Sequence, residues 1–254
     1  MGAHAALHGT TMRTWTSSNG VTDAATVAGL ITPNAGPYLV STAAVALENT
    51  HNFGGGTVQP YSHLVEVSQL CRDAGVKLHL DGARLWNAHV ATGVALVDYG
   101  RLFDTVNVCF SKGLGAPIGS LICGPADVMP EARRLKILFG GAWRQAGIVA
   151  AAGLLALEEG PRRLHEDHAR ARRLAAAIAE IVPGGLDPQG VETNMVFVDT
   201  EPAVMTPLEA VQRLEGEGVG ATLVSGNVRM VTHVDIADED VETAIAAWKV
   251  VVAG

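Results

Sequence analysis

The sequence has 254 residues, of which 48% are hydrophobic and 17% are charged, so it can bury a sizeable core. Its 18 Lys and Arg residues against 26 Asp and Glu residues give a net charge of −8, and only 5% of residues are aromatic. No basic stripe with interleaved aromatic residues is present, which argues against nucleic-acid binding. We therefore expect small-molecule chemistry.

The sequence predicts neither export nor membrane attachment. The longest run of apolar and small residues, 147–157, ends at Glu158 and is shorter than the roughly 20 residues that cross a bilayer. The first residues lack the cationic start and apolar stretch of a signal peptide. The three cysteines have no CxxC spacing, and Cys109 and Cys123 lie in apolar runs where we expect reduced, buried thiols. A cytoplasmic location fits this pattern.

Short apolar or β-branched runs alternate with helical patterns between residues 43 and 124. This alternation predicts an α/β fold built from successive strand–helix–strand units with a parallel sheet. We predict strands at 43–47, 76–80, 105–110 and 119–123, and a helix at 61–74. Gly75 supplies the left-handed residue that ends this helix.

A second unit is predicted to begin near Pro161, which suits the first turn of a helix at 162–182. A strand at 194–198, a helix at 207–217, a strand at 228–232 and a helix at 238–252 then follow. We therefore expect a large sheet domain at residues 1–158 and a smaller α/β domain at residues 159–254.

Polar residues directly follow the first three predicted strands. These are Glu48-Asn49-Thr50-His51-Asn52, Asp81-Gly82-Ala83-Arg84 and Ser111-Lys112-Gly113. Because ligands of open parallel sheets bind outside the carboxyl ends of the strands, Asp81 and Lys112 could face one ligand. Pyridoxal phosphate needs such a pair: the lysine amine forms the Schiff base, and the carboxylate keeps the pyridine nitrogen protonated.

Each of these residues also has a simpler interpretation. A lysine after a strand is usually a solvated loop charge, and Asp-Gly is usually a turn. His79 and Asp81 resemble the start of a metal site, but no further ligand cluster supports one, so we expect no metal. The segment His165-Glu166-Asp167-His168 differs from the HExxH pattern, and we expect it to form a solvated helix face.

Several motifs together resemble the low-specificity L-threonine aldolases, in that family's order over nearly the whole chain. They are Glu48-Asn49-Thr50-His51-Asn52 with Gly54-Gly55-Gly56, residues 78–85, residues 111–120, Arg144-Gln145-Ala146-Gly147, residues 193–198 and residues 228–233. The resemblance implies a pyridoxal-phosphate-dependent transferase-like fold (fold type I), with a large mixed, mostly parallel sheet domain and a smaller C-terminal α/β domain. It further implies a homodimer or homotetramer that cleaves β-hydroxy amino acids, such as L-threonine and L-allo-threonine, to glycine and an aldehyde.

The resemblance also assigns roles to single residues. Lys112 is the catalytic lysine that bonds to the cofactor, and Asp81 is the partner of the pyridine nitrogen. Arg84 lies beside the phenolic oxygen of the cofactor. Arg229 binds the substrate carboxylate, where its planar fork suits two-point recognition.

Two further residues line the site by the same resemblance: Arg144 next to the cofactor, and His51 as a second catalytic residue. The chain also departs from the family. The family histidine near the substrate hydroxyl aligns with Tyr38, and the family's Gly-Gly-Gly-Met reads Gly140-Gly141-Ala142-Trp143. These differences leave the contacts to the substrate hydroxyl open.

Family members also carry upstream segments that are not found in this chain: a serine-aspartate segment, a glycine-threonine turn that holds the cofactor phosphate, and a histidine stacked on the pyridine ring. Neither His4 nor His8 replaces that histidine. Besides an aldolase, the sequence therefore leaves open a catalytically impaired fragment or remnant, and a pyridoxal-phosphate-dependent β-eliminating lyase. For the chain as given we expect low stability, weak cofactor binding and little threonine cleavage.

Overall fold

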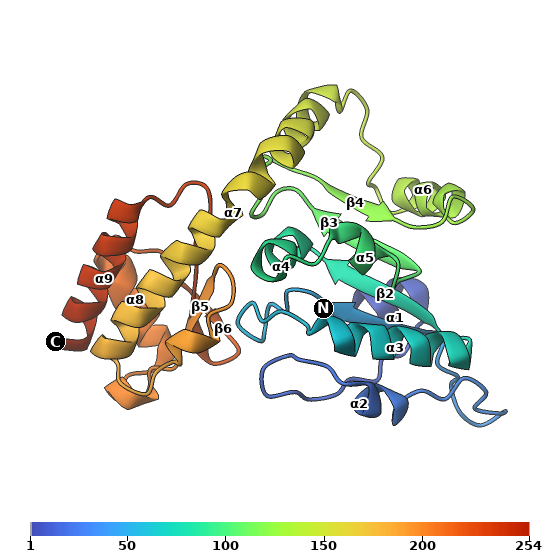
Figure 1. Cartoon of the computed structure of the whole chain (residues 1–254), viewed down its shortest axis with the longest axis horizontal. Helices are drawn as coiled ribbons and strands as arrows, with labels where there is room; N and C mark the ends of the chain where they lie inside the picture. The colour runs from blue at the N-terminus through green and yellow to red at the C-terminus, as the bar shows by residue number, and fades with distance from the viewer. Residues whose placement is uncertain (1, 254) are drawn as a thin grey trace.

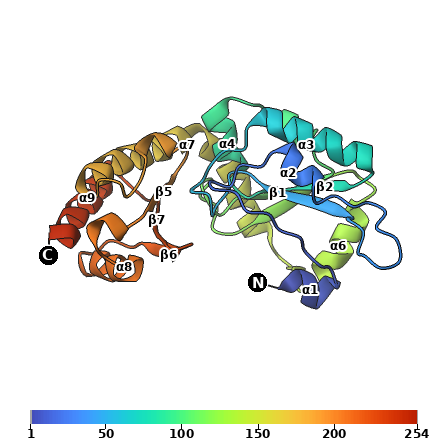
Figure 2. The same cartoon turned by 90° about the horizontal axis from the view of Figure 1, so that it is seen from below.

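The computed structural model describes residues 2–253, which form two α/β units joined by one long helix, α7 (Figures 1 and 2). The elements of the first unit precede α7 in the chain. They are α1 (Ala3–His8), α2 (Ala24–Ala28), β1 (Ala44–Glu48), α3 (Tyr61–Ala74), β2 (Lys77–Gly82), α4 (Leu85–Thr92), α5 (Leu96–Gly100), β3 (Thr105–Cys109), β4 (Ser120–Cys123) and α6 (Met129–Leu138).

The large sheet has the strand order β1-β2-β3-β4. The first three strands are parallel, and β4 runs antiparallel to β3, so the sheet is mixed but mostly parallel. Every second residue of β1, β2 and β3 is buried, which is the alternation expected when one face of a strand lies on the core. The predicted strands match the observed ones within one residue at each end, except that β2 continues through Asp81 and Gly82, two residues beyond its predicted end.

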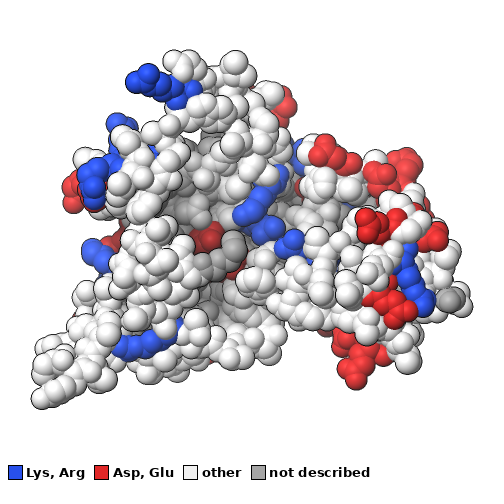
Figure 3. Space-filling model, turned by 180° about the vertical axis from the view of Figure 1, so that it is seen from behind, with Lys and Arg blue, Asp and Glu red and all other residues white. Residues whose placement is uncertain are grey.

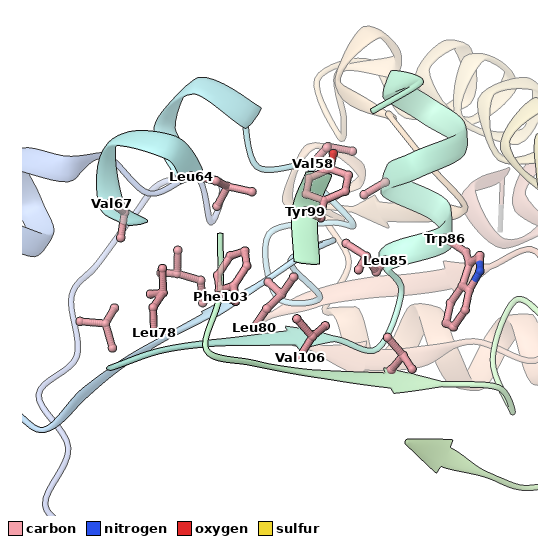
Figure 4. Close-up of a cluster of buried hydrophobic side chains, with 14 of the residues drawn as sticks. Val58, Leu64, Val67, Leu78, Leu80, Leu85, Trp86, Tyr99, Phe103 and Val106 are labelled. Atoms are coloured by element: carbon pink, nitrogen blue, oxygen red, sulfur yellow. The ribbon is translucent and has the colours of Figure 1, made fainter. Parts of the chain in front are cut away.

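The core of the first unit lies between this sheet and helices α3, α4 and α5 (Figure 4). Leu80 and Val67 are fully buried, and Tyr99 packs edge-on against Tyr61 with ring centroids 5.7 Å apart. Burying one large aliphatic side chain contributes about 1.5–3 kcal/mol, so a cluster of this size fixes the sheet firmly. The carboxyl ends of β1, β2 and β3 are therefore held in place by a well-packed layer.

The second unit follows in the chain and has its own sheet and core. Its elements are α7 (Gly147–Ile181), a short 3₁₀ turn at Pro188–Gly190, β5 (Met195–Val198), a second 3₁₀ turn at Glu201–Ala203, α8 (Pro207–Gly216), β6 (Thr222–Val224), β7 (Asn227–Val231) and α9 (Asp238–Ala253). The antiparallel sheet has the order β5-β7-β6. Trp248 of α9 is fully buried in this core, and its indole N–H lies 3.2 Å from the sulfur of Met230.

Helix α7 corrects one prediction, because it does not begin at Pro161 but runs through it over 35 residues. The residue before a proline normally resists helical geometry because its Cβ meets the proline ring, and Gly160 has no Cβ. The apolar run 147–157 is itself helical, so the proline costs one backbone hydrogen bond without ending the helix.

The two clusters of buried hydrophobic residues meet near the middle of α7, where the first extends to Leu164 and the second begins at Ala171. The predicted division into domains at residues 158 and 159 stays a prediction, since one continuous helix crosses it.

One surface of the first unit differs from the rest in its exposed apolar side chains. All four residues of β4 are exposed, and so are large side chains of α6 and of the first turns of α7. We call β4, α6 and residues 147–155 the open face; its exposed large hydrophobic residues are Leu121, Ile122, Ile137, Leu138, Ile148, Leu154 and Leu155.

The cysteine prediction is wrong for two of the three thiols. Cys123 lies on β4 and is exposed, and Cys109 is half-buried at the end of β3. The buried thiol is Cys71 of α3, whose pKa is raised by burial. Within residues 2–253, no helix combines the length and the apolar composition that a membrane crossing requires.

Candidate active site

The strand register brings three polar residues side by side at the carboxyl end of the large sheet. Glu48 of β1 is paired with Asp81 of β2, and Asp81 is paired with Asn107 of β3. One oxygen of Asp81, Oδ1, accepts a hydrogen bond from the N–H of Ala83 at 3.0 Å and another from Nδ2 of Asn107 at 2.9 Å. Among the described residues nothing donates to the second oxygen, Oδ2, so the carboxylate is oriented while one of its oxygens stays available.

Asn107 was not singled out from the sequence, although a signal for it exists. It is the only amide side chain in the strand Thr-Val-Asn-Val-Cys, and its neighbours Val106 and Val108 are buried on the opposite face. A polar residue between two buried valines faces the same side as the strand-end carboxylate next to it. Pairing the predicted strands in parallel register would have placed it beside Asp81.

His51 lies in the loop after β1 and is oriented by the backbone. Its Nδ1 accepts a hydrogen bond from the N–H of Gly54 at 3.0 Å, so the proton of the neutral ring is on Nε2. Nε2 lies 3.9 Å from Oε2 of Glu48. Burial raises the pKa of the Glu48 carboxyl, and the hydrogen bond from the N–H of Asn52 acts in the opposite direction.

Two arginines from different units share one acceptor. Oδ1 of Asn52 lies 3.4 Å from Nη1 of Arg84, at the start of α4, and 2.9 Å from Nη1 of Arg229, on β7. Nε of Arg229 also donates to Oγ1 of Thr222 on β6, at 3.2 Å. Burial lowers the pKa of Arg84, and the positive charge of Arg229 lowers it further. We call Asn52, Asp81, Arg84, Asn107 and Arg229 the strand-end cluster.

Lys112 follows β3 in a tight loop whose backbone is fixed by packing. The carbonyl of Lys112 accepts the N–H of Gly115 at 2.9 Å. A Cβ on Gly113 would lie 2.8 Å from Cδ2 of Leu164 on α7, so a larger residue there would require the Leu164 side chain to shift. The side chain of Lys112 is exposed, and its amine makes no hydrogen bond or ion pair with the described residues. The loop is thus held by α7 while the amine is free to react.

The helix face behind this loop corrects a second prediction. His168 and Asp167 of α7 are 3% and 0% exposed, so the prediction of a solvated face is wrong for these two residues, whereas His165 and Glu166 are exposed. Nε2 of His168 lies 3.1 Å from Nδ2 of Asn87 on α4, and the amide oxygen of Asn87 lies close to Gly113. Burial is the main reason why the pKa of His168 is lowered to about 4, so this histidine is neutral at physiological pH.

Other residues named from the sequence make no hydrogen bond with the strand-end cluster. Arg144 is exposed in the loop between α6 and α7 and makes no hydrogen bond or ion pair with the described residues. Tyr38 is 94% exposed. His8 packs edge-on against Phe139, with ring centroids 5.1 Å apart, at the side of α6 (Figure 2). His79 bonds to Oγ1 of Thr105 at 2.8 Å, and residues 2–253 contain no group of three metal-ligating side chains.

Basic and acidic side chains gather at one hollow of the molecular surface. Figure 3 shows basic side chains gathered near a hollow at the middle of one face, with acidic atoms deeper inside it. A hollow with an acidic floor and a basic rim suits a small ligand that carries both an amine and an acidic group.

The fold and these strand-end residues define an open α/β protein with polar side chains gathered at the carboxyl edge of its parallel strands, where ligands of such sheets bind. Residues 1–201 match the family model described as beta-eliminating lyase, and the chain belongs to this family.

Among curated proteins, the chain is 36% identical over 221 residues to the low-specificity L-threonine aldolase 1 of Arabidopsis thaliana, covering 85% of this chain and 61% of the relative. It is 37% identical over 212 residues to the low specificity L-threonine aldolase of Escherichia coli, covering 84% of this chain and again 61% of the relative. The chain therefore spans about 61% of the length of these two relatives.

Solved structures show the same fold. A threonine aldolase of Leishmania major superposes with a TM-score of 0.75 at 20% identity, covering 98% of this chain and 75% of that one. An aspartate aminotransferase of Thermus thermophilus gives a TM-score of 0.66 at 20% identity, covering 91% of this chain and 60% of that one. The predicted fold class, α/β of the pyridoxal-phosphate-dependent transferase-like type (fold type I), is confirmed.

Proposed function

We propose that this protein binds pyridoxal phosphate at the strand-end cluster and cleaves L-threonine, L-allo-threonine and related β-hydroxy amino acids to glycine and an aldehyde. The observation that carries the proposal is the pairing of an oriented carboxylate, Asp81, with a free amine, Lys112, at the ends of neighbouring parallel strands. The aldolase names of the relatives favour carbon–carbon cleavage over β-elimination.

The residues present fit this cofactor. Bound pyridoxal phosphate supplies an aldehyde that reacts with amines and a ring that withdraws electrons from the α-carbon of an amino acid. Lys112 would hold it covalently through Nζ, and the available oxygen of Asp81 would keep a proton on the pyridine nitrogen. The hydrogen bonds from Ala83 and Asn107 to the other oxygen keep the Asp81 carboxylate correctly turned for this role.

The substrate carboxylate would bind at Arg229. Its Nη1 already contacts an oxygen of Asn52, which shows that an oxygen acceptor fits at this position. Arg84 reaches the same oxygen from the other unit, so a carboxylate placed here would meet two guanidinium groups. Charge-assisted hydrogen bonds of this kind are about twice as strong as neutral ones and fix the orientation of the ligand.

His51 would act from the loop after β1. With Nδ1 accepting the N–H of Gly54, the neutral ring presents a proton at Nε2 toward Glu48. The pair of His51 and Glu48 can therefore hold a proton near the substrate. Arg144 would contribute to the cofactor site only after the loop that carries it moves, because it is exposed and unpaired among the described residues.

We also propose a cytoplasmic homodimer or homotetramer, as the resemblance to threonine aldolases implies. Apolar side chains such as Ile148, which is 86% exposed, support an assembly in which part of the open face is covered.

The proposed function is tested by product analysis. The chain, alone and joined to the N-terminal region of the Arabidopsis relative, is incubated with pyridoxal phosphate and L-threonine, and glycine and acetaldehyde are measured. We expect both products in equal amounts from at least one of the two proteins. Ammonia and a keto acid would indicate β-elimination instead, and the absence of glycine from both proteins would refute the proposal.

A further inference from the structure

The side-chain oxygen of Asn52 accepts hydrogen bonds from two arginines, one in each of the two units. Arg84 approaches this oxygen from the large sheet and Arg229 from the small sheet, at 3.4 and 2.9 Å. The oxygen therefore marks the place where both guanidinium groups converge.

The backbone around Asn52 is held from both sides. Its N–H donates to Oε1 of Glu48 at 3.2 Å, and its carbonyl accepts the N–H of Gly55 at 3.2 Å. Four residues later, the carbonyl of Gly56 accepts Oγ1 of Thr193 from the second unit, at 2.8 Å. The loop thus places the amide between the arginines by contacts that do not involve the amide itself.

The chemistry of the side chain at this point matters because the two cations repel each other. An amide oxygen can accept from both guanidinium groups, but it carries no net charge and so adds nothing to the compensation that the Glu48 and Asp81 carboxylates give Arg84. A carboxylate at the same point would form a permanent ion pair with both arginines and would compete with any anionic ligand. The neutral amide therefore keeps the arginines together while preserving their affinity for an anion.

We propose that Asn52 is a positioning and specificity-determining residue: its amide oxygen holds Arg84 and Arg229 around one point in the free protein and yields that point to the carboxylate of the amino acid substrate. The substrate class rests on the proposed function, whereas the requirement for a carboxylate rests on the geometry of the two arginines. Nδ2 of Asn52 makes no hydrogen bond with the described residues, so the displaced amide can turn and donate to the bound anion.

Three variants, made in whichever of the two proteins of the product analysis cleaves L-threonine, test the proposal by steady-state kinetics with this substrate. For Asn52→Asp we expect a Michaelis constant raised by about 100-fold, since its carboxylate occupies the arginines, with kcat changed by less than about twofold. For Asn52→Ala we expect a rise of about tenfold, the size of one lost hydrogen bond. Asn34→Asp adds the same charge at an exposed loop position before β1 and should change neither constant.

A second readout needs no turnover. Formate, the smallest carboxylate, should raise the thermal unfolding midpoint of the wild-type chain and of Asn34→Asp, because a ligand that binds only the folded state stabilises it. Asn52→Asp should show a higher midpoint without formate and no further rise with it. A formate response in Asn52→Asp equal to that of the wild type would overturn the proposal.

The two readouts separate the two proposals. If the wild type fails to cleave threonine but Asn52→Asp alone loses the formate response, the proposed function is wrong and the role of Asn52 stands. If the wild type cleaves threonine and all three variants share its Michaelis constant, the proposed function stands and the role of Asn52 is refuted.

Discussion

The strand-end cluster and the open face both include residues of the large sheet but differ in how their side chains are held. In the cluster, Asp81 has two donors on one oxygen, and Asn52 joins two arginines. On the open face, the four residues of β4 are all exposed, and Leu154 of α7 is 69% exposed. The carboxyl ends of β1, β2 and β3 thus carry polar side chains held by hydrogen bonds, while β4 exposes apolar side chains to water.

Lys112 combines features of both regions, because its backbone is packed and its side chain is exposed. Its loop is fixed by Gly113 against Leu164 and by Leu114 against Gly160, contacts that belong to the packed side. Its side chain is exposed, and its amine makes no hydrogen bond or ion pair with the described residues. The position of Lys112 therefore depends on the buried core and not on the open face.

The largest effect is expected from removing the lysine. Lys112→Ala should abolish covalent attachment of pyridoxal phosphate and the visible absorbance that accompanies it, because no other amine follows a strand beside Asp81. Lys136→Ala, on the exposed side of α6, is the matched control and should leave the absorbance unchanged. Unchanged visible absorbance in Lys112→Ala would show that the cofactor does not bond to Lys112.

Two leucines sharpen the contrast between packed and exposed strands. Leu80 of β2 is 0% exposed and Leu121 of β4 is 51% exposed. Leu80→Ala should lower the free energy of unfolding by about 2–5 kcal/mol through loss of burial and the cavity left behind. Leu121→Ala should change it by less than about 0.5 kcal/mol. Urea unfolding measures both, and equal losses would show that β4 is as well packed as β2.

Asp81→Asn tests the oriented carboxylate. The amide keeps the shape and the contact with Asn107 but cannot hold a proton on the pyridine nitrogen. We expect covalent cofactor binding to persist and kcat to fall by at least about 100-fold, the scale of losing one preorganised electrostatic contact at a reacting centre. Asp98→Asn on α5, at an exposed ion pair with Arg101, should leave kcat unchanged. A wild-type kcat in Asp81→Asn would refute this role.

Arg229→Ala should act on substrate binding. Losing a charge-assisted contact costs about 1.5–3 kcal/mol, so the Michaelis constant for L-threonine should rise by about 10- to 100-fold while cofactor affinity is kept. Arg101→Ala, at the exposed pair with Asp98, serves as control. If the Michaelis constant were unchanged, the carboxylate would bind elsewhere.

His168 connects the Lys112 loop to acid stability. Its pKa is lowered to about 4 from 6.5 in the folded protein, so the neutral form is favoured by folding. The contribution of neutral His168 to the free energy of unfolding is fully present above pH 6.5, the pKa of this histidine in the unfolded chain. It is lost as the pH falls from 6.5 toward 4. Between about pH 7 and about pH 5 the loss is roughly 2 kcal/mol.

The control for this pH dependence is His168→Gln, which can still accept from Asn87 but cannot be protonated. Urea unfolding at both pH values should show a smaller acid loss in the variant than in the wild type. The same acid loss in both proteins would assign the pH dependence to other groups.

Strand positions and strand-end residues could be predicted from the sequence because both depend on local pattern. Short apolar or β-branched runs between helical patterns located β2 and β3, and the polar residues that follow each predicted strand marked Asp81, Arg84 and Lys112. Contacts between distant segments could not be predicted in this way. The bridge from Asn52 to Arg229 joins the two units across the fold, and no local pattern reports it.

Tertiary packing also overrode two local signals. Pro161 is typical of a helix start, but α7 continues through it. This part of α7 is buried against α4 and the Lys112 loop. The segment 165–168 is polar and looks solvated, yet His168 is buried where α7 crosses α4. Burial by a distant element decided both cases.

The most direct test of the central claim is to map where pyridoxal phosphate attaches. The protein is incubated with the cofactor, reduced with borohydride, digested, and analysed by mass spectrometry for the modified lysine. We predict that the cofactor is found on Lys112, beside the oriented carboxylate of Asp81. Attachment to Lys77, Lys136 or Lys249 instead, or attachment to none of the lysines, would contradict the account.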